Sequence, residues 1–374
     1  MKKTSLIALC TFFLAYGNAS AFSPYHYANT FSANNIIAIQ HSIMANAMQT
    51  FEGTAAAALG GRAKLFGDAN RYMYGMPPMY GRPHLYGEYG DDGTAQKSAQ
   101  GRNGGDDTTA NANTERTDPR PIVNSVWLNW QHIDDDVKFR GYDELDTNTD
   151  IISIGLAGGE AQWGIGISEW GIFGGYIGGD QENEFVNISE NGGYIGLYTG
   201  YNIKNFNLSF AGTAGALFNG AEHEYGTDEY ANTWAGVAMN ATFNLELDDS
   251  FTIQPGVYAG YTWIGSANYA SMAGALVENH NFNTFEVAPE IRAIKHLGSG
   301  WFGFINFKYA FMFGGAGDTT VNGIGYEELE TRDYAEYGLG IEKSIDRFNV
   351  SLNINRRDGG RTGWNGGFNL KYIF

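Results

Sequence analysis

Cysteine is nearly absent from this sequence. Cys10 is the sole cysteine among 374 residues, and it falls in a segment with the pattern of a secretory signal. The signal has a charged start (Lys2, Lys3), an apolar core (Leu6–Tyr16) and an A-x-A cleavage site that ends at Ala21. Leu9 stands where a lipoprotein box needs a small residue, so we expect no lipid anchor at Cys10. The mature chain is therefore expected to lack cysteine, which excludes disulfides and thiolate metal sites.

Basic residues are also few. Lysine and arginine number 23 against 41 aspartates and glutamates, which gives a formal net charge of −18. Loss of Lys2 and Lys3 with the signal would lower the net charge by two, to −20. This acidity argues against nucleic acid and against anionic lipid as partners.

Long apolar runs are missing as well. The sequence has no run of about 18 apolar residues, so it predicts no transmembrane helix. Charged residues make up 17% and hydrophobic residues 43%, whereas aromatic residues reach 15% and glycines number 52. This composition is typical of strands that alternate between lipid and a polar lumen. A soluble all-β protein would have similar values.

The region before residue 125 differs in composition from the rest. Its strongly helical pattern is Asn34–Thr54, where Ile, Met and Ala recur at intervals of three and four. Tyr72–Tyr89 is rich in Tyr, Gly, Met and Pro, and Asp91–Pro121 is polar and of low complexity. We therefore divide the chain into a signal (1–21), a helix followed by a disordered linker (22–124) and a β-domain (125–374).

From Ser125 onward, apolar and polar residues alternate in twelve segments. In Phe348–Asn355, for example, every second residue is large and apolar, which places these side chains on one face of a strand. The predicted strands are Ser125–Ile133, Asp150–Gly158, Glu169–Gly178, Gly193–Asn202, Asn205–Leu217, Thr233–Leu245, Phe251–Trp263, Thr284–Lys295, Gly300–Phe313, Tyr334–Lys343, Phe348–Asn355 and Trp364–Phe374.

The connections between these segments alternate in length. They are tight after most even-numbered segments, as at Ile203-Lys204 and Asp248-Asp249. The long ones follow odd-numbered segments: Asp134–Thr149, Gly179–Gly192, Phe218–Asn232, Ile264–Asn283 and Gly314–Asp333. An outer-membrane barrel sorts its loops in this way, with long loops outside and short turns in the periplasm. The sequence therefore predicts an all-β fold, a twelve-stranded antiparallel transmembrane β-barrel of the outer-membrane type, preceded by a helix and a low-complexity linker.

The last predicted strand, Trp364–Phe374, stops on an aromatic residue. Its apolar face consists of Phe368, Leu370, Tyr372 and Phe374. Bacterial outer-membrane barrels commonly end this way, and the resemblance implies that the periplasmic assembly machinery reads these four residues.

With the strands laid out, residues 125–374 resemble the autotransporter β-domain, the translocator of type V secretion. The matching features, in order, are VWLNW (Val126–Trp130), GIFGGY (Gly171–Tyr176), GLYTGY (Gly196–Tyr201), strands bearing Pro255 and Pro289, and the aromatic terminus. The resemblance implies a helix threaded through the pore, for which Asn34–Thr54 is the candidate. It also implies export or surface display of an N-terminal segment, residence in the outer membrane, and folding by periplasmic chaperones and the barrel-assembly machinery.

Autotransporters usually carry a large passenger before the helix, whereas here only Phe22–Ala33 separates the signal from it. Asn34-Asn35 resembles the asparagine pair at which some autotransporters release their passenger, but the surrounding residues do not match that motif. Two functions remain open. One is a translocator with little or no passenger, and the other is a plain outer-membrane barrel serving as a pore, adhesin or envelope component.

Candidate chemistry is sparse. Glu286, Glu290 and Arg292 share the predicted lumen side of one strand, where they could polarise a nucleophile or hold the helix, although porin-like interiors are commonly charged. The histidine–carboxylate cluster Glu222-His223-Glu224 lies in a predicted acidic loop and is a weak metal site. No serine–histidine pair or phosphate-binding motif accompanies them. We predict no enzyme, no cofactor and no metal, and a monomer in contact with outer-membrane lipid.

Overall fold

The computed structural model describes residues 123–139, 144–158, 161–163, 166–182, 186–203, 205–248, 250–279, 281–315, 319–326 and 330–374. The predicted signal with its cleavage site at Ala21, the helix Asn34–Thr54, the tyrosine-rich segment and the linker lie outside these ranges. Within the ranges, no helix is long and apolar enough to cross a membrane.

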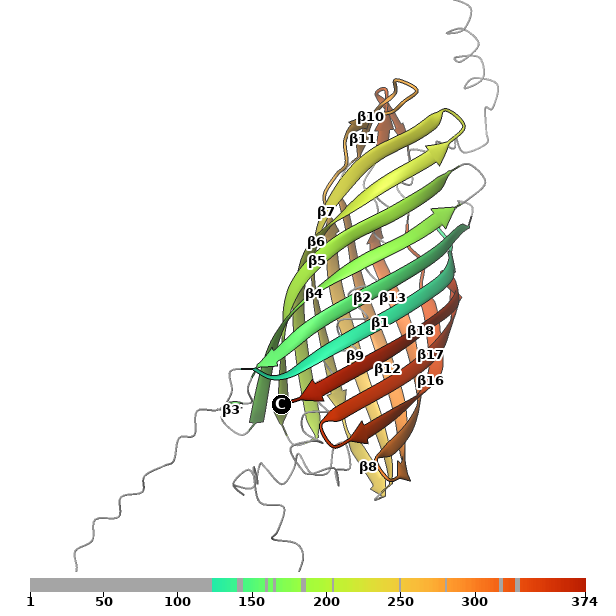
Figure 1. The fold of residues 1–374 in the computed structure, drawn as a ribbon. Helices are drawn as coiled ribbons and strands as arrows, with labels where there is room; N and C mark the ends of the chain where they lie inside the picture. Colours follow the sequence, from blue (N-terminus) through green and yellow to red (C-terminus); the bar gives the residue numbers. More distant parts are fainter. Residues whose placement is uncertain are drawn as a thin grey trace, which may run out of the picture.

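Twelve long strands of the described chain close into one antiparallel β-barrel (Figure 1). They are β1 (Val123–Val137), β2 (Leu145–Gly158), β4 (Gly166–Glu182), β5 (Asn187–Ile203), β6 (Phe206–His223), β7 (Gly226–Phe243), β9 (Phe251–Ile264), β12 (Phe282–Gly298), β13 (Trp301–Gly315), β16 (Tyr334–Ile345), β17 (Phe348–Gly359) and β18 (Arg361–Ile373). Each strand pairs with the barrel strands that precede and follow it, and β1 pairs with β18 to close the ring. The predicted barrel is confirmed, and every predicted strand overlaps a barrel strand.

Two short strands extend this sheet. β3 (Ala161–Trp163) pairs with β4, and β8 (Leu245–Asp248) pairs with β9. The β7–β9 ladder stops at Thr242, and the β8–β9 ladder resumes at Leu245 in the same register, on either side of Pro255. The β12–β13 ladder skips Pro289 in the same way. Proline has no N–H to donate to a ladder, so β7 and β8 are one strand interrupted opposite a proline.

The two ends of the barrel differ. At the end that carries Val123 and Phe374, which we call the turn end, only two residues separate β5 from β6, β8 from β9, β12 from β13, and β16 from β17. At the opposite end, the loop end, the predicted long loops over residues 134–149, 179–192 and 218–232 are wrong, because they consist mostly of strand. Gly226, with φ of +132°, begins β7 only three residues after β6 ends at His223. Glycine accepts this backbone conformation, which permits the tight turn.

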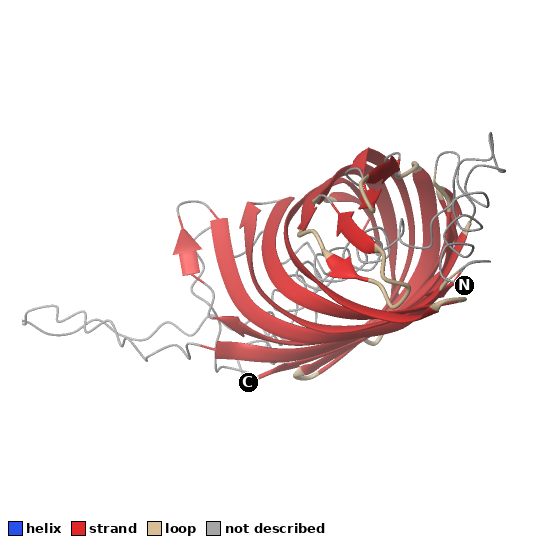
Figure 2. Cartoon of the chain, turned by 90° about the horizontal axis from the view of Figure 1, so that it is seen from above, coloured by secondary structure: helices blue, strands red, loops and turns tan. Residues whose placement is uncertain are grey.

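The two remaining long connections form a small sheet of their own at the loop end. It consists of β10 (Tyr269–Ala270), β11 (Leu276–Asn279), β14 (Thr319–Val321) and β15 (Ile324–Tyr326), in that order. Asn322 and Gly323, with φ of +52° and +79°, turn β14 into β15, as expected for a two-residue hairpin. Seen from above, the short strands lie inside the ring of barrel strands (Figure 2).

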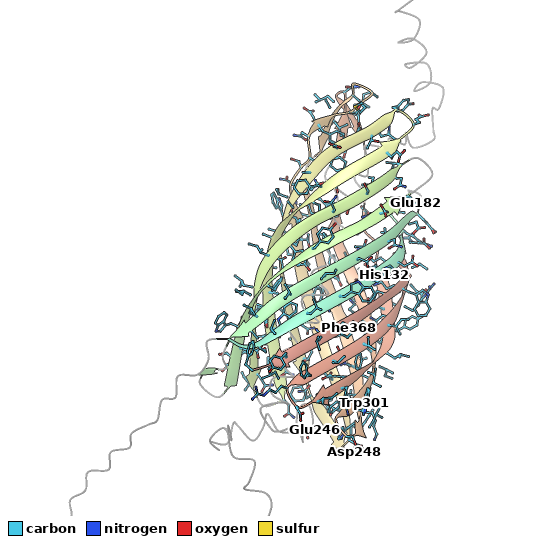
Figure 3. All side chains as sticks on the ribbon, viewed as in Figure 1. His132, Glu182, Glu246, Asp248, Trp301 and Phe368 are labelled. Atoms are coloured by element: carbon cyan, nitrogen blue, oxygen red, sulfur yellow. The ribbon has the colours of Figure 1, made fainter. Side chains whose placement is uncertain are left out.

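The outward face of the barrel is apolar. Exposed aliphatic side chains form its middle band: Ile154, Ile195, Leu197, Val237, Ile305 and Leu339. Nearer the loop end, Trp130, Tyr261 and Tyr337 donate hydrogen bonds to Asp150, Asn283 and Asp358, at 3.0, 2.8 and 2.7 Å. Near the turn end, the Trp301 ring lies 4.9 Å from Lys343 Nζ, and Figure 3 shows Trp301 far from Glu182 at the loop end. Aromatic rings flanking an apolar band are typical of membrane barrels.

The inward face is divided into two walls. On β1, β4, β5 and β7, five buried aromatic residues form the aromatic wall, with neighbouring ring centroids 6.0–6.4 Å apart: Trp127, Phe173, Tyr194, Tyr198 and Trp234. Glycines opposite them on adjacent strands leave room for the rings. On β12 to β18 and the loop end of β1, the inward side chains are mainly charged or amide-bearing. The functional candidates lie on this charged wall.

Candidate functional site: a charged row across the closing strands

A row of inward-facing charges crosses the strands where the barrel closes. Lys308 on β13, Glu336 on β16 and Arg357 on β17 stand opposite one another in register. The row continues through Gly363 on β18 to Asp135 on β1. Strand pairing alone therefore aligns four ionisable groups from four strands on one inward level, with a glycine between the last two.

The charges of this row are paired at short distances. Arg357 Nη1 lies 2.5 Å from Asp135 Oδ2, and Arg357 Nε lies 2.7 Å from Glu336 Oε2. Lys308 Nζ lies 3.5 Å from Glu336 Oε1. The side chains of Arg357 and Asp135 are exposed by 1% and 0%, so these are buried, charge-assisted hydrogen bonds. Removing one partner would leave the other charge buried and unpaired.

Glycine at position 363 makes room for the ion pair between Arg357 and Asp135, which crosses β18. Arg357 reaches over β18 to Asp135, and a Cβ atom at position 363 would lie 2.7 Å from Asp135 Oδ1. The same Cβ would lie 2.0 Å from the Asp134 carbonyl oxygen. A larger residue here would push β1 and β18 apart where they close the barrel.

Further groups surround the row. Asn365 Nδ2 donates to Glu336 Oε2 at 3.0 Å, and Arg361 Nη1 lies 3.9 Å from Asp135 Oδ2. The Tyr334 ring lies within 6 Å of three cations, which is favourable for a cation–π contact: 5.9 Å from Arg357, 5.7 Å from Arg361 and 5.7 Å from Lys308. The cluster therefore consists of opposite charges bound to one another.

The predicted lumen charges Glu286, Glu290 and Arg292 lie on the inward face of β12. Glu286 Oε1 accepts from the Tyr334 hydroxyl at 3.4 Å, which links it to the charged row. Glu290 Oε1 accepts from Asn240 Nδ2 at 2.9 Å, across β9. The Arg292 guanidinium lies 3.9 Å from the centre of the Phe304 ring. The three residues contact three different partners.

The sequence pattern does not single out the members of the row. Asp135 stood in a predicted acidic loop, and nothing marked Arg357, Glu336 or Lys308. Inward alternation places each of them on the lumen side, and this was the available signal. Their meeting depends on the register between strands far apart in sequence, which alternation does not give.

The histidine cluster is dispersed by the same alternation. His223 points inward and is buried, whereas Glu222 and Glu224 are exposed. His223 Nε2 instead lies 3.1 Å from Asp228 Oδ2 on the next strand. In the part of the chain that the structure describes, no group of three histidine, cysteine or acidic residues is arranged to hold a metal ion.

Of the predicted assembly terminus, Phe368, Leu370 and Tyr372 lie on the outward side of β18, and Phe374 follows the strand directly. Phe368 and Leu370 are half-buried between the flanking strands β17 and β1. The Tyr372 ring lies 4.8 Å from Phe348 and 5.6 Å from Phe374, at the turn end. Phe374 itself is 57% exposed, so its ring is available to a partner or to lipid.

Comparison with known proteins identifies the fold of this barrel. A search of protein-family models found no match, and a search of curated proteins found none. Among solved structures, the transport unit of the autotransporter AIDA-I from Escherichia coli superposes with a TM-score of 0.59 at 17% identity. That match covers 71% of this chain and 94% of the other.

Two further autotransporter structures agree. The β-domain of the Bordetella autotransporter BrkA gives a TM-score of 0.56 at 15% identity over 67% of this chain and 100% of its own. The translocator domain of NalP from Neisseria meningitidis gives 0.52 at 13% identity, over 69% and 90% of the two chains. At such identities the likeness concerns the fold. This chain has the twelve-stranded outer-membrane barrel fold seen in autotransporter translocator domains.

Proposed function

We propose that the protein is an outer-membrane translocator barrel that exports or displays its own N-terminal segment. In this proposal, the twelve long barrel strands span the outer membrane, the loop end faces the exterior, and the turn end faces the periplasm. The exposed aliphatic band contacts lipid. Phe368, Leu370, Tyr372 and Phe374 are read by the assembly machinery while the barrel forms.

The burial of the barrel's inward face carries this proposal. Ile151, Ile177 and Leu217 point inward and are 0% exposed, and polar Ser153 and Asn232 are also 0% exposed. Side chains just fill a barrel of about eight strands, and twelve strands enclose a wider lumen. Complete burial of these wall residues on β2, β4, β6 and β7 supports a lumen that is filled rather than open.

Asn34–Thr54 is the occupant that we propose. A helix of this length would span about 30 Å, the thickness of the hydrocarbon core, and is about 10–12 Å across. Its sequence has apolar residues on one side and Gln40, His41, Asn46 and Gln49 on others. The polar residues suit hydrogen bonding to the charged wall, including Glu286, Glu290 and Arg292.

No catalytic role forms part of the proposal. The strongest candidates for chemistry, Asp135, Glu336 and Arg357, are bound to one another at 2.5–2.7 Å. A carboxylate held in a buried ion pair is a poor general base, because its charge is already stabilised by the guanidinium. The groups are suited to holding the wall together.

Planar-bilayer conductance tests the proposal. We expect the full mature chain to conduct far less than a chain that begins at Asn124. An epitope tag inserted between Phe22 and Ala33 should also be accessible on intact cells. Equal, large conductance of both chains would contradict the plug and favour the plain pore, and a tag reached only after the cells are opened would contradict display.

A further inference from the structure

We propose that the two long loops form one lid over the loop end of the lumen, and that Asp228 latches this lid to the barrel wall. The lid consists of residues 265–279 and 319–326. Its release would open the lumen to the exterior. This gate is separate from the proposed export role, since it concerns access from the opposite side.

The two loops behave as one structural unit. Leu276 N–H donates to Asn322 Oδ1 at 2.9 Å, and Asn322 N–H donates to the Leu276 carbonyl at 2.9 Å. Ala275, Val277 and Val321 form a small buried core of their own, against which Tyr269 packs. Backbone pairing and a shared core mean that neither loop can leave without the other.

Asp228 on β7 joins this unit to the barrel. Its Oδ1 accepts from the Met272 N–H at 2.7 Å, and its Oδ2 lies 3.1 Å from His223 Nε2. The side chains of His223 and Asp228 are both 1% exposed. The Tyr225 N–H donates to His223 Nδ1 at 3.2 Å, so the ring proton is on Nε2 and is donated to Asp228. A buried carboxylate thus holds the lid backbone with one oxygen and the wall with the other.

Other contacts place the lid on the lumen side of β7. The Tyr230 and Tyr269 rings stack with centroids 4.9 Å apart and an interplanar angle of 8°. Asn232 Nδ2 donates to the Gly265 carbonyl at 3.0 Å. Asp228, Tyr230 and Asn232 all alternate to the inward face. The lid therefore extends inward from the wall, in agreement with its place at the top of Figure 1 and inside the ring in Figure 2.

The position of Met272 allows a precise test. Gly274 N–H donates to the Ser271 carbonyl at 2.8 Å, so Met272 is the second residue of a β-turn. Proline is favoured at that position of a turn. Met272→Pro therefore keeps the turn and removes the lid N–H that donates to Asp228. Met272→Ala is the matched control, since it trims the side chain and keeps the N–H.

Opening is measured on the full chain through a buried reporter. Ala221 is 4% exposed, points inward and lies opposite Asp228 in register, so Ala221→Cys places a thiol at the latch. The other cysteine, Cys10, lies in the predicted signal. Intact cells are treated with a membrane-impermeant maleimide, and the rate of thiol labelling is followed.

We expect Met272→Pro to raise the labelling rate about tenfold, as for loss of one hydrogen bond to a charged group, and Met272→Ala to leave it unchanged. Asp228→Ala should match Met272→Pro, while Glu229→Ala, on the exposed face of the same strand, should match the wild type. Retained heat-modifiable migration shows that each barrel is assembled. The proposal would be overturned by equal labelling rates for the Met272→Pro and Met272→Ala variants. Fast labelling of the Ala221→Cys protein with no change in the lid would also overturn it.

Discussion

At the scale of single residues, several inward aromatic rings in this barrel pack directly over a glycine on the neighbouring strand. Trp127 lies opposite Gly155, Phe173 opposite Gly196, and Tyr194 opposite Gly175. A Cβ atom at each of these glycines would lie 2.2–2.3 Å from a ring atom of its partner. The rings therefore lie against backbone rather than against side chains.

Gly155→Ala should accordingly destabilise the barrel. The new methyl group would lie 2.2 Å from Trp127 Cζ2, and overpacking of this kind costs about 1–3 kcal/mol. The measurement is the urea or heat midpoint at which the compact band is lost on a gel. Gly212→Ala on β6 is the control, because a Cβ there meets no atom within 4 Å. Equal midpoints for both variants would contradict the claim that Gly155 makes room for the Trp127 ring.

A second residue-scale prediction concerns Phe374. Its ring contacts Tyr372 at 5.6 Å and is otherwise exposed, so its deletion should cost the finished barrel no more than about 1.5 kcal/mol. The yield of assembled barrel in cells should nevertheless fall, with more periplasmic degradation, because the terminus is proposed to be read during assembly. Unchanged yield in the deletion would remove the assembly role.

At the scale of elements, the closing strands are held by the charged row as well as by backbone pairing. Asp135→Asn should lower the free energy of unfolding by about 3–5 kcal/mol, because Arg357 would keep a buried and incompletely paired charge. The double variant Asp135→Asn/Arg357→Met should be more stable than Asp135→Asn, since it removes that charge. Unfolding midpoints in urea give the comparison.

The neighbouring carboxylate supplies the control for this prediction. Asp134 is on the exposed face of β1, so Asp134→Asn should change the free energy of unfolding by less than about 1 kcal/mol. A loss as large as that of Asp135→Asn would mean that general charge, rather than the ion pair, stabilises the closure.

The β1–β2 hairpin at the loop end carries a pair of like-charged carboxylates. Asp136 and Asp146 stand opposite each other, beyond the aromatic residues of the outward face. Partial burial, followed by repulsion between the two, raises the pKa of Asp136. Partial burial, followed by the charges of Asp134 and Glu182, raises the pKa of Asp146. A folded-state pKa above the unfolded value means that the hairpin gains stability as pH falls through the folded pKa.

Asp146→Asn should therefore protect residues 134–149 from hydrogen exchange at pH 7. Near pH 3 the same substitution should have little effect, because both carboxyls are then protonated in the parent protein. The effect is modest, since both groups remain largely exposed to solvent and salt. Equal protection factors for variant and parent at pH 7 would contradict the repulsion.

The outcome for these loop-end hairpins shows how far the sequence could predict the fold. Alternation located the middle of each barrel strand, as in Phe348–Asn355, because one face of these strands is apolar throughout. It failed at Asp134–Thr149 and Phe218–Asn232, where the outward face is mostly polar and the local pattern is that of a loop. Those residues form strands because Asp135 and Asp228 have partners across the structure, and such partners follow from register.

At the scale of the whole molecule, the barrel interior has two unlike sides. Strands β1 to β7 present the aromatic wall together with a few buried acidic residues (Asp135, Glu169, Glu190 and Asp228), while β12 to β18 present lysine, arginine, glutamate and asparagine. A segment within the lumen would be oriented by this difference, with its apolar side toward Trp127 and Tyr194. The sequence could therefore predict that charged residues such as Glu286 face the lumen. It could not predict which charges pair with one another.

The charged row also sets an order in time. Asp135 is synthesised 222 residues before Arg357, the residue that neutralises it. A chain that ends before β17, or one whose last strand has not docked, presents a bare carboxylate on the inner side of its first strand. Completion of the ring thus coincides with cancellation of that charge, and a nascent barrel that is still open differs electrostatically from one that is finished.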